Sequence, residues 1–272
     1  MNVAGKTILI TGSTDGLGRL VAKRLAASGA NVLAHGRSKE RGVALVNEIR
    51  ADKKGSAAFY QADLSSLAEV RKLAQAVSKD HNRIDVLVNN AGIGSAPMNT
   101  RAESSDGHEL RFAVNYLAGF LLTYLLLPSV LKAAPSRIVN VASIGQQPLE
   151  FEDVMLAQSY DGGRAYRQSK LAQIMFTIDL AQELAGKKVT VNSLHPATFM
   201  DTTMVRQSGT KPLSTVDQGA DAVMKLVVSD EVAGESGLFF NGLNEARANE
   251  QVYDVDARKK LRELSLQLTG LS

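Results

Sequence analysis

Short apolar runs alternate with longer amphipathic stretches along most of this chain. Most runs are rich in Val, Ile and Leu and have the length of buried strands, whereas the stretches between them repeat apolar residues at helical spacing. We expect strands at residues 6–11, 31–35, 57–61, 84–88, 137–141, 189–194 and 238–241. We expect helices at residues 17–28, 39–50, 66–79, 107–131, 164–184 and 257–268.

This alternation predicts an α/β protein built from successive βαβ units. Right-handed crossovers then give a doubly wound, parallel, seven-stranded sheet with helices on both faces. No linker rich in Pro, Gly or Ser divides the chain, so we expect one domain over residues 1–272. Residues 146–163 and 198–214 lack a core pattern. In such sheets the loops beyond the carboxyl ends of the strands hold the ligand.

The composition narrows the class of protein. Of the 272 residues, 44% are hydrophobic and 22% are charged, which is typical of a globular domain. The net charge is only +3 and aromatic residues make up 5%, so we expect no nucleic-acid partner. The absence of cysteine excludes disulfides and thiolate ligands, and the four histidines lack metal-ligand spacing, so we expect no metal.

The apolar segments predict no membrane anchor. The N-terminus lacks the pattern of a signal peptide, and the first predicted strand begins almost at once. The most apolar later segment, residues 116–131, is shorter than the roughly 20 residues that span a bilayer, and Pro128 interrupts it. We therefore expect a buried helix there and a cytoplasmic location.

A glycine-rich loop between the first strand and the first helix is the strongest binding signal. Gly12 permits a tight turn, Gly16 lets the backbone approach a phosphate, and Gly18 lets the helix pack close to the strand. The helix N-terminus offers amides and a positive dipole to a pyrophosphate. The predicted cofactor contacts from this loop are Gly12, Ser13, Thr14, Asp15, Gly16, Leu17 and Gly18.

The residues after the second strand indicate which dinucleotide binds. An NAD site usually places a carboxylate there, whereas this chain has Arg37 followed by Ser38. A guanidinium can pair with a 2′-phosphate, so we expect NADP(H) in preference to NAD(H), which stays open. The alternative is that Arg37 is a solvated surface residue.

Two further loops complete the predicted cofactor site. Asp63 and Leu64 follow the third strand and either contact the adenine or belong to the cap of the next helix. Asn90, Ala91 and Gly92 follow the fourth strand, where small residues let the backbone approach a cofactor closely.

Tyr166 and Lys170 stand four residues apart on a predicted helix and therefore share one face. The pKa of a free tyrosine is about 10, and a nearby ammonium group favours the phenolate and lowers that pKa. The pair suits proton transfer to an alkoxide or from an alcohol. Such pairs are common and usually structural, so the pair alone does not establish an enzyme.

The combination is more specific than its parts. The loop at 11–18, residues 89–92, Asn115, Ser143, and Tyr166 with Lys170 follow in this order at suitable separations. Together they resemble the classical short-chain dehydrogenase/reductase superfamily over nearly the whole chain. The resemblance implies a Rossmann-type fold and an oxidoreductase in which Tyr166 is the acid/base. It also implies that Lys170 lowers the pKa of that tyrosine and binds ribose, that Ser143 polarises the substrate carbonyl, and that Asn115 holds a relay water.

Three strings, at 112–117, 165–172 and 261–271, are similar to the retinol-dehydrogenase-like branch of that superfamily. The branch implies NADP(H) and a hydrophobic aldehyde or ketone with its alcohol. It also implies a homodimer or homotetramer, for which residues 116–127 and 171–184 are candidate contact surfaces. Asp15 departs from the pattern because some NADP-preferring relatives have a basic residue there, which leaves the 2′-phosphate mainly to Arg37.

The resemblance also divides the chain by role. Residues 1–142 mainly bind the dinucleotide, and residues 143–272 carry catalysis, a substrate lid and the C-terminal elements. Pro196 and Thr198 resemble the loop that meets the nicotinamide carboxamide. We expect substrate contacts from Ser143, Gly145, Gln146 and Phe199. The alternatives are a ketoacyl- or steroid-type reductase on the same scaffold and a dinucleotide-binding sensor without turnover.

Overall fold

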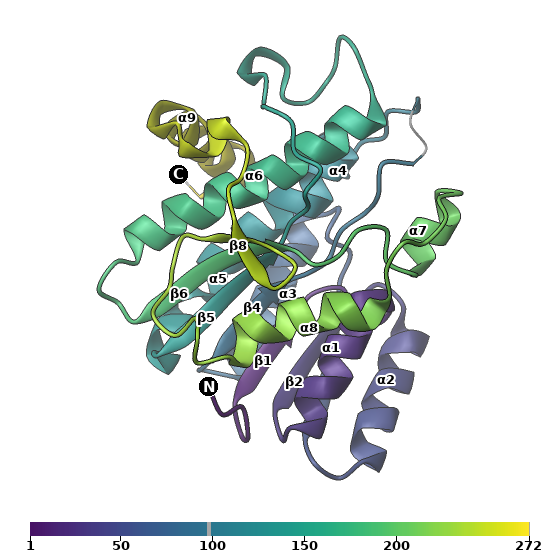
Figure 1. Ribbon diagram of the computed structural model, residues 1–272, viewed down its shortest axis with the longest axis vertical. Coiled ribbons are helices and arrows are strands. Elements are labelled where there is room, and N and C mark those ends of the chain that lie inside the picture. The colour runs from purple at the N-terminus through teal and green to yellow at the C-terminus, as the bar shows by residue number, and fades with distance from the viewer. Residues whose placement is uncertain (97–98, 272) are drawn as a thin grey trace.

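A computed structural model describes residues 1–96 and 99–271 of the chain. Within these residues, eight strands form one sheet with helices on both faces (Figure 1). The order across the sheet is β3-β2-β1-β4-β5-β6-β7-β8. The strands are β1 (Thr7–Ile10), β2 (Asn31–Gly36), β3 (Ser56–Gln61), β4 (Val86–Asn89), β5 (Ser136–Val141), β6 (Val189–His195), β7 (Phe239–Asn241) and β8 (Asn244–Ala246).

The first seven strands run parallel, as the alternation of elements predicts. The eighth strand is a correction to the expected seven. β8 turns back antiparallel to β7 and pairs Ala246 with Phe239. Its three residues, Asn-Glu-Ala, have no apolar alternation, so the sequence pattern gives no sign of a strand there.

Alternate strand residues face two separate cores. Leu9 points into the core under one set of helices, and its neighbours Ile8 and Ile10 point into the other. The helices α1 (Gly16–Ala27), α2 (Lys39–Ala51) and α8 (Val216–Val228) cover one face of the sheet. The helices α3 (Leu67–Asp80), α5 (Ala118–Ala133) and α6 (Gly162–Glu183) cover the other (Figure 1).

α8 is a correction to the predicted helices, although a capping box and apolar residues at helical spacing mark it in the sequence. Thr215 accepts a hydrogen bond from the backbone of Gln218, and the Gln218 side chain accepts one from the backbone of Thr215. This capping box precedes apolar residues at helical spacing, among them Val223 and Val227, which are buried beside α1. The helix closes the face of the sheet that carries the glycine-rich loop.

The predicted helix at 107–131 is composite. It consists of α4 (Leu110–Phe112), the π-helical turn η1 (Ala113–Leu117) and α5, which continues through Pro128. Residues 110–133 are long and apolar enough to cross a membrane by length and composition alone, and 61% of the most apolar window is buried within the protein. The helix continues through Pro128, which does not break it, because the residues on either side pack in the core.

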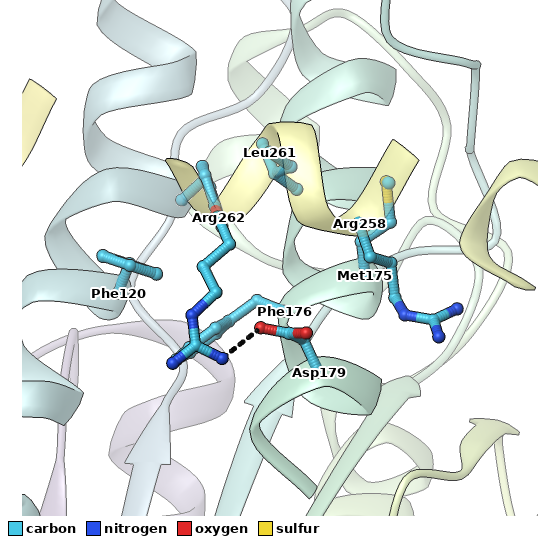
Figure 2. A pocket seen from close by; sticks show the side chains of 8 residues that line it. Phe120, Met175, Phe176, Asp179, Arg258, Leu261 and Arg262 are labelled. Atoms are coloured by element: carbon cyan, nitrogen blue, oxygen red, sulfur yellow. Dashed lines mark hydrogen bonds and ion pairs between the residues drawn. The ribbon is translucent and has the colours of Figure 1, made fainter. Parts of the chain in front are cut away.

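The C-terminal helix α9 (Val255–Thr269) packs across α6 and the turn η1 (Figure 2). Leu261 is 2% exposed there, and the hydroxyls of Tyr116 and Ser265 lie 2.7 Å apart. Arg262 donates to Asp179 at 3.1 Å. Part of the surface at 116–127 and 171–184 that was predicted to contact another subunit is thus covered by the chain itself.

The remaining elements are short. They are the 3₁₀ turns η2 (Phe151–Asp153) and η3 (Glu250–Tyr253) and the five-residue helix α7 (Thr203–Gln207).

Candidate functional site

The glycine-rich loop is held by contacts that leave no room for side chains. Gly12 has φ of +65°, and a Cβ there would lie 2.8 Å from the Cα of Ala91. A Cβ on Gly18 would lie 2.4 Å from the carbonyl oxygen of Gly12. The loop therefore passes directly into α1, where the first-turn amides of Leu17 and Gly18 have no intrahelical acceptor. The chain presents the N-terminus of a twelve-residue helix, which suits a pyrophosphate.

His35 supports this loop from the end of β2, a role that sequence reasoning missed. Its Nδ1 accepts from the Gly12 amide at 3.1 Å, and its Nε2 lies 3.2 Å from the carbonyl oxygen of Ala62. Burial lowers the pKa of His35 to about 4, so the ring is neutral and carries its proton on Nε2. A lone histidine in an apolar strand has no spacing that signals this contact.

Two residues that were predicted to contact the cofactor have side chains that cap helices instead. Asp15 caps α1, and its carboxylate lies 3.3 Å from the guanidinium of Arg41. The Ser38 hydroxyl accepts from the Arg41 amide at 3.2 Å and caps α2. The side chain of Arg37 is exposed and has no acidic partner among the residues that the structure describes. Arg37 is therefore available to an anionic group, whereas Asp15 is a helix cap.

The loop after β4 is fixed to the end of β1. The Thr11 hydroxyl accepts from the amides of Asn90 and Ala91, each at 3.0 Å. The Asn90 side chain donates to the Thr11 carbonyl at 2.8 Å. Ser13 and Thr14 are buried against the end of β2, where the Ser13 hydroxyl accepts from the His35 amide at 2.9 Å and the Thr14 side chain abuts Gly36. The structure thus brings these predicted contacts to one edge of the sheet.

Asp63 and Leu64 lie after β3 without a clear role toward a ligand. The Asp63 carboxylate accepts from the Ser65 amide at 2.9 Å, and Ser66 caps α3. Leu64 is 6% exposed and packs in the core. Both residues therefore have a local structural explanation, which is the turn and the core before α3.

Asn115 lies in the π-helical turn and joins the cofactor loop to α6. Its Oδ1 accepts from the Ile93 amide at 2.7 Å, and its Nδ2 donates to the Ile93 carbonyl and to the Ser169 hydroxyl. A Cβ on Gly92 would lie 3.2 Å from the Asn115 Oδ1 and 3.4 Å from the Lys170 Nζ. Close approach of these groups explains why glycine stands at position 92.

Ser143, Tyr166 and Lys170 meet beside that loop. The hydroxyls of Ser143 and Tyr166 are hydrogen-bonded, and the Lys170 Nζ lies 5.8 Å from the centre of the Tyr166 ring. The ammonium group is held by the Val141 carbonyl and the Gln173 side chain, each at 2.9 Å. The structure therefore brings the predicted hydroxyl, phenol and ammonium groups together from the loop after β5 and from α6.

Burial changes the proton affinities in this cluster. It lowers the pKa of Lys170 to about 7, and burial together with the Lys170 charge lowers the pKa of His195 to about 4. Burial raises the pKa of Tyr166, which the hydrogen bond from Ser143 only partly offsets. This direction is opposite to the one expected from the Tyr166–Lys170 spacing, because the ammonium group lies on other acceptors and burial dominates.

The residues predicted to contact substrate surround this cluster. Gly145 donates its amide to the Ser143 hydroxyl at 3.0 Å. Gln146 has both ends engaged, since its side chain donates to the Ser143 carbonyl and accepts from the Asn249 amide. The sequence did not predict this link between the site and the C-terminal segment. Gln146 therefore connects the loop after β5 to the C-terminal segment.

The segment after β6 reaches over the same region. Pro196 is buried, and the exposed Thr198 lies with its hydroxyl 3.1 Å from the His195 Nε2. Phe199 is 48% exposed and has φ of +43°, an unusual conformation for an aromatic residue. The side chain of Met204 in α7 lies 3.2 Å from a Cβ position on Gly94. α7 therefore lies over the loop that follows β4.

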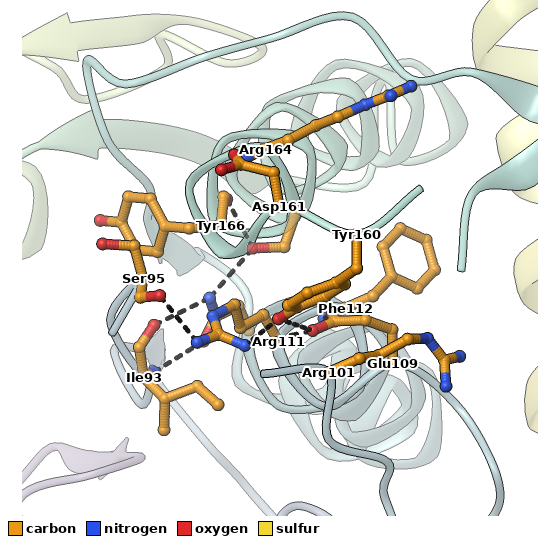
Figure 3. Close-up of polar contacts among 12 residues, drawn as sticks. Ile93, Ser95, Arg101, Glu109, Arg111, Phe112, Tyr160, Asp161, Arg164 and Tyr166 are labelled. Atoms are coloured by element: carbon orange, nitrogen blue, oxygen red, sulfur yellow. Dashed lines mark hydrogen bonds and ion pairs between the residues drawn. The ribbon is translucent and has the colours of Figure 1, made fainter. Parts of the chain in front are cut away.

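A buried cluster on the other side of that loop was not predicted. Arg111, Glu109 and Tyr160 meet there, and Arg111 donates to backbone carbonyls of the loop (Figure 3). The sequence signal is weak, because Tyr160 stands 49 positions after Arg111 in another segment.

Comparison with known proteins agrees with this geometry. A sequence model described as short chain dehydrogenase matches residues 6–212. The chain is 34% identical to retinol dehydrogenase 13 of Mus musculus, and the match covers 99% of this chain and 85% of the relative. The match to retinol dehydrogenase 14 of Homo sapiens has 36% identity and covers 98% and 87%.

Solved structures show the same architecture. An uncharacterized protein from Mycobacterium paratuberculosis superposes with a TM-score of 0.83 at 30% identity, over 99% of this chain and 95% of that one. The Pseudomonas aeruginosa RhlG/NADP active-site complex superposes with a TM-score of 0.73 at 28% identity, over 88% and 95%. This chain belongs to the short-chain dehydrogenase family of oxidoreductases, in its retinol-dehydrogenase-like branch.

Proposed function

We propose that the protein is an NADP(H)-dependent oxidoreductase that interconverts a hydrophobic aldehyde or ketone with its alcohol. The observation that carries this proposal is the meeting of Ser143, Tyr166 and Lys170 beside the backbone of Gly92. Two hydroxyl groups and a buried ammonium group that lie together can stabilise the negative charge that develops on an alkoxide oxygen. Dinucleotide binding alone does not require this set.

The residues present fit a dinucleotide at the carboxyl ends of β1, β2 and β4. The N-terminus of α1 would hold the pyrophosphate, and the exposed side chain of Arg37 would hold a 2′-phosphate. RhlG, which shares the fold, was solved with NADP. When bound, the nicotinamide supplies the hydride. We assign residues 1–142 mainly to this binding and residues 143–272 mainly to catalysis and substrate contacts.

The chain's own residues supply and move the proton. The buried phenol of Tyr166 is protonated at neutral pH and donates to the carbonyl oxygen during reduction. The Ser143 hydroxyl donates a second hydrogen bond that orients that oxygen. Lys170, whose pKa burial lowers to about 7, can return a proton to Tyr166. Asn115 contributes by holding Ile93 and Ser169 in place, next to any relay water.

The rim of the site supports a hydrophobic substrate. Apolar side chains are unusually exposed there, and they come from the loop after β5 and from residues 199–213. They are Ile144 (48% exposed), Phe199 (48%), Met204 (41%) and Leu213 (70%). A long aliphatic or cyclic group covering these side chains would remove apolar surface from water.

The first test is turnover by wild-type protein and by Tyr166→Phe. With NADPH we expect turnover of apolar aldehydes, including retinal, and a loss of at least roughly 100-fold in kcat for Tyr166→Phe, because the proton donor is gone. NADPH affinity, measured by fluorescence titration, stays within about twofold, since the phenol hydroxyl is not needed for binding. Tyr60→Phe is the matched control, because that hydroxyl donates to Asp80 at the β3 edge of the sheet, three or more strands from the catalytic residues.

The outcomes separate this proposal from its alternatives. Turnover only of a ketosteroid or a β-ketoacyl thioester would keep the mechanism and replace the substrate class. Tight NADPH binding without turnover of any carbonyl would instead indicate a sensor. Equal affinity for NADPH and NADH would contradict the role of Arg37.

We propose a cytoplasmic location and a homo-oligomer whose contacts lie outside the surface that α9 covers. Cell fractionation and sedimentation of the purified protein test them.

A further inference from the structure

The cluster of Glu109, Arg111 and Tyr160 has no part in the chemistry above, yet it is buried beside the site. The side chains of Arg111 and Glu109 are 3% and 1% exposed. The Arg111 guanidinium donates to the Gly94 carbonyl at 3.0 Å and to the Ser95 carbonyl at 2.8 Å (Figure 3). A buried guanidinium that donates hydrogen bonds to backbone carbonyls fixes the orientation of the peptides that carry them.

The cluster ties this loop to two other segments. Glu109 caps α4 by accepting from the Phe112 amide at 2.7 Å, and its other oxygen lies 3.4 Å from Arg111. The Tyr160 hydroxyl bonds both Arg111 and Glu109, the latter at 3.2 Å. Tyr160 lies at the end of the long segment between β5 and α6. One hydroxyl group therefore connects that segment, α4 and the loop after β4.

The loop at 92–96 runs between the catalytic residues and α7. Gly92 abuts Asn115 and Lys170, the Ile93 backbone bonds Asn115 through both its amide and its carbonyl, and Gly94 faces Met204. These residues thus form a wall with the catalytic set at one end and α7 at the other. A shift of the peptides at 94–95 changes the space beside Tyr166 without touching its proton.

We propose that Arg111 is a positioning residue that sets this wall, with Glu109 and Tyr160 as its supports, and thereby sets the affinity for the hydrophobic carbonyl substrate. The inference rests on the proposed function. Contacts between the wall and a substrate tail are made equally in the ground state and the transition state. Loss of the cluster therefore raises KM and leaves kcat nearly unchanged.

The test uses Tyr160→Phe, which removes one hydroxyl and keeps the Glu109–Arg111 pair. The loss of hydrogen bonds worth about 1 kcal/mol predicts a KM for an apolar aldehyde roughly 3- to 10-fold higher. We expect kcat within about twofold and an unchanged NADPH affinity. Tyr60→Phe removes a hydroxyl that donates to Asp80, away from the site, and should change neither constant. A fall in kcat with KM unchanged would overturn the proposal.

A second measurement does not depend on turnover. Hydrogen exchange of the amides at 92–96 should accelerate severalfold in Tyr160→Phe and more in Arg111→Lys, which keeps the charge beside Glu109 but loses the planar fork. Unchanged exchange in both variants would refute the positioning role even if the wild-type enzyme is active. Faster exchange in a protein that turns over no carbonyl would refute the proposed function and leave the structural coupling standing.

Discussion

His35 and Asn115 each hold two chain segments with one side chain. The Asn115 side-chain amide is hydrogen-bonded to Ile93 and Ser169. The two ring nitrogens of His35 are hydrogen-bonded to Gly12 and Ala62. The histidine can do so only while neutral, because a proton on Nδ1 would face the Gly12 amide. Burial lowers the pKa of His35, and the low pKa keeps the ring in the neutral form that these contacts require.

His35 makes the fold sensitive to acid. Its pKa is about 4 in the folded chain and near 6.5 in the unfolded one, so the unfolded chain binds more protons between these values. Stability should fall as pH falls from 6.5 to 4, by on the order of 3 kcal/mol from this residue.

The variant His35→Asn tests this source of acid sensitivity. Asparagine keeps an acceptor for Gly12 but does not titrate. Urea unfolding at pH 7 and pH 4.5 should show that the variant loses less free energy of unfolding between the two pH values than the wild type. Part of the loss should remain, because His195 also has a pKa of about 4. An identical loss in both proteins would assign the acid sensitivity elsewhere.

At the scale of elements, α8 depends on its capping box. The helix has buried residues along one side and closes the sheet face beside α1. Its first turn is fixed by the reciprocal bonds of Thr215 and Gln218. A frayed first turn would loosen the packing of Val216 and Ala220 near the glycine-rich loop.

Thr215→Ala should therefore lower the free energy of unfolding by about 1 kcal/mol, the usual value of an N-cap. Thermal and urea unfolding measure the change. Thr202→Ala is the matched control, since Thr202 caps α7, a five-residue surface helix with no buried residue. Equal losses in both variants would mean that α8 does not share in the global unfolding unit.

The elements also show what a sequence can and cannot predict. Seven strands and the glycine-rich loop followed from apolar runs and glycine positions, because those patterns report backbone geometry directly. The strand at 244–246 is too short and polar for any pattern. Arg111 and Tyr160 stand 49 positions apart, and only the fold brings them together. The proton affinity of Tyr166 depends on burial, which spacing on a helix does not contain.

At the scale of the whole molecule, α9 completes the core. Leu261 is buried where α9 packs on α6 and η1, and Arg262 pairs with Asp179 on α6 (Figure 2). Arg262 also pairs with Glu183 on the same helix. The chain thus covers an apolar surface with its own last helix. Any subunit contact must use other surfaces or the outer side of α9.

Leu261→Ala should lower the free energy of unfolding by about 2–5 kcal/mol, the usual range for a buried leucine. Leu213→Ala is the comparison, because Leu213 is 70% exposed and its loss should cost less than about 0.5 kcal/mol. Chemical denaturation of both variants measures the difference. Similar values would show that α9 is only loosely docked.

The π-helical turn at Ala113–Leu117 has a consequence for how this gene can change in length. A wide turn holds one residue more than a regular one, and each helical residue advances the chain by about 100° around the axis. With this turn in place, Asn115 faces the loop after β4 while Leu121 and Leu122 face the core. Deleting one residue there would restore a regular helix and rotate one face away from its partners. A substitution in this segment changes only the contacts of the side chain that is replaced, whereas a single-codon deletion would disconnect the site from the core.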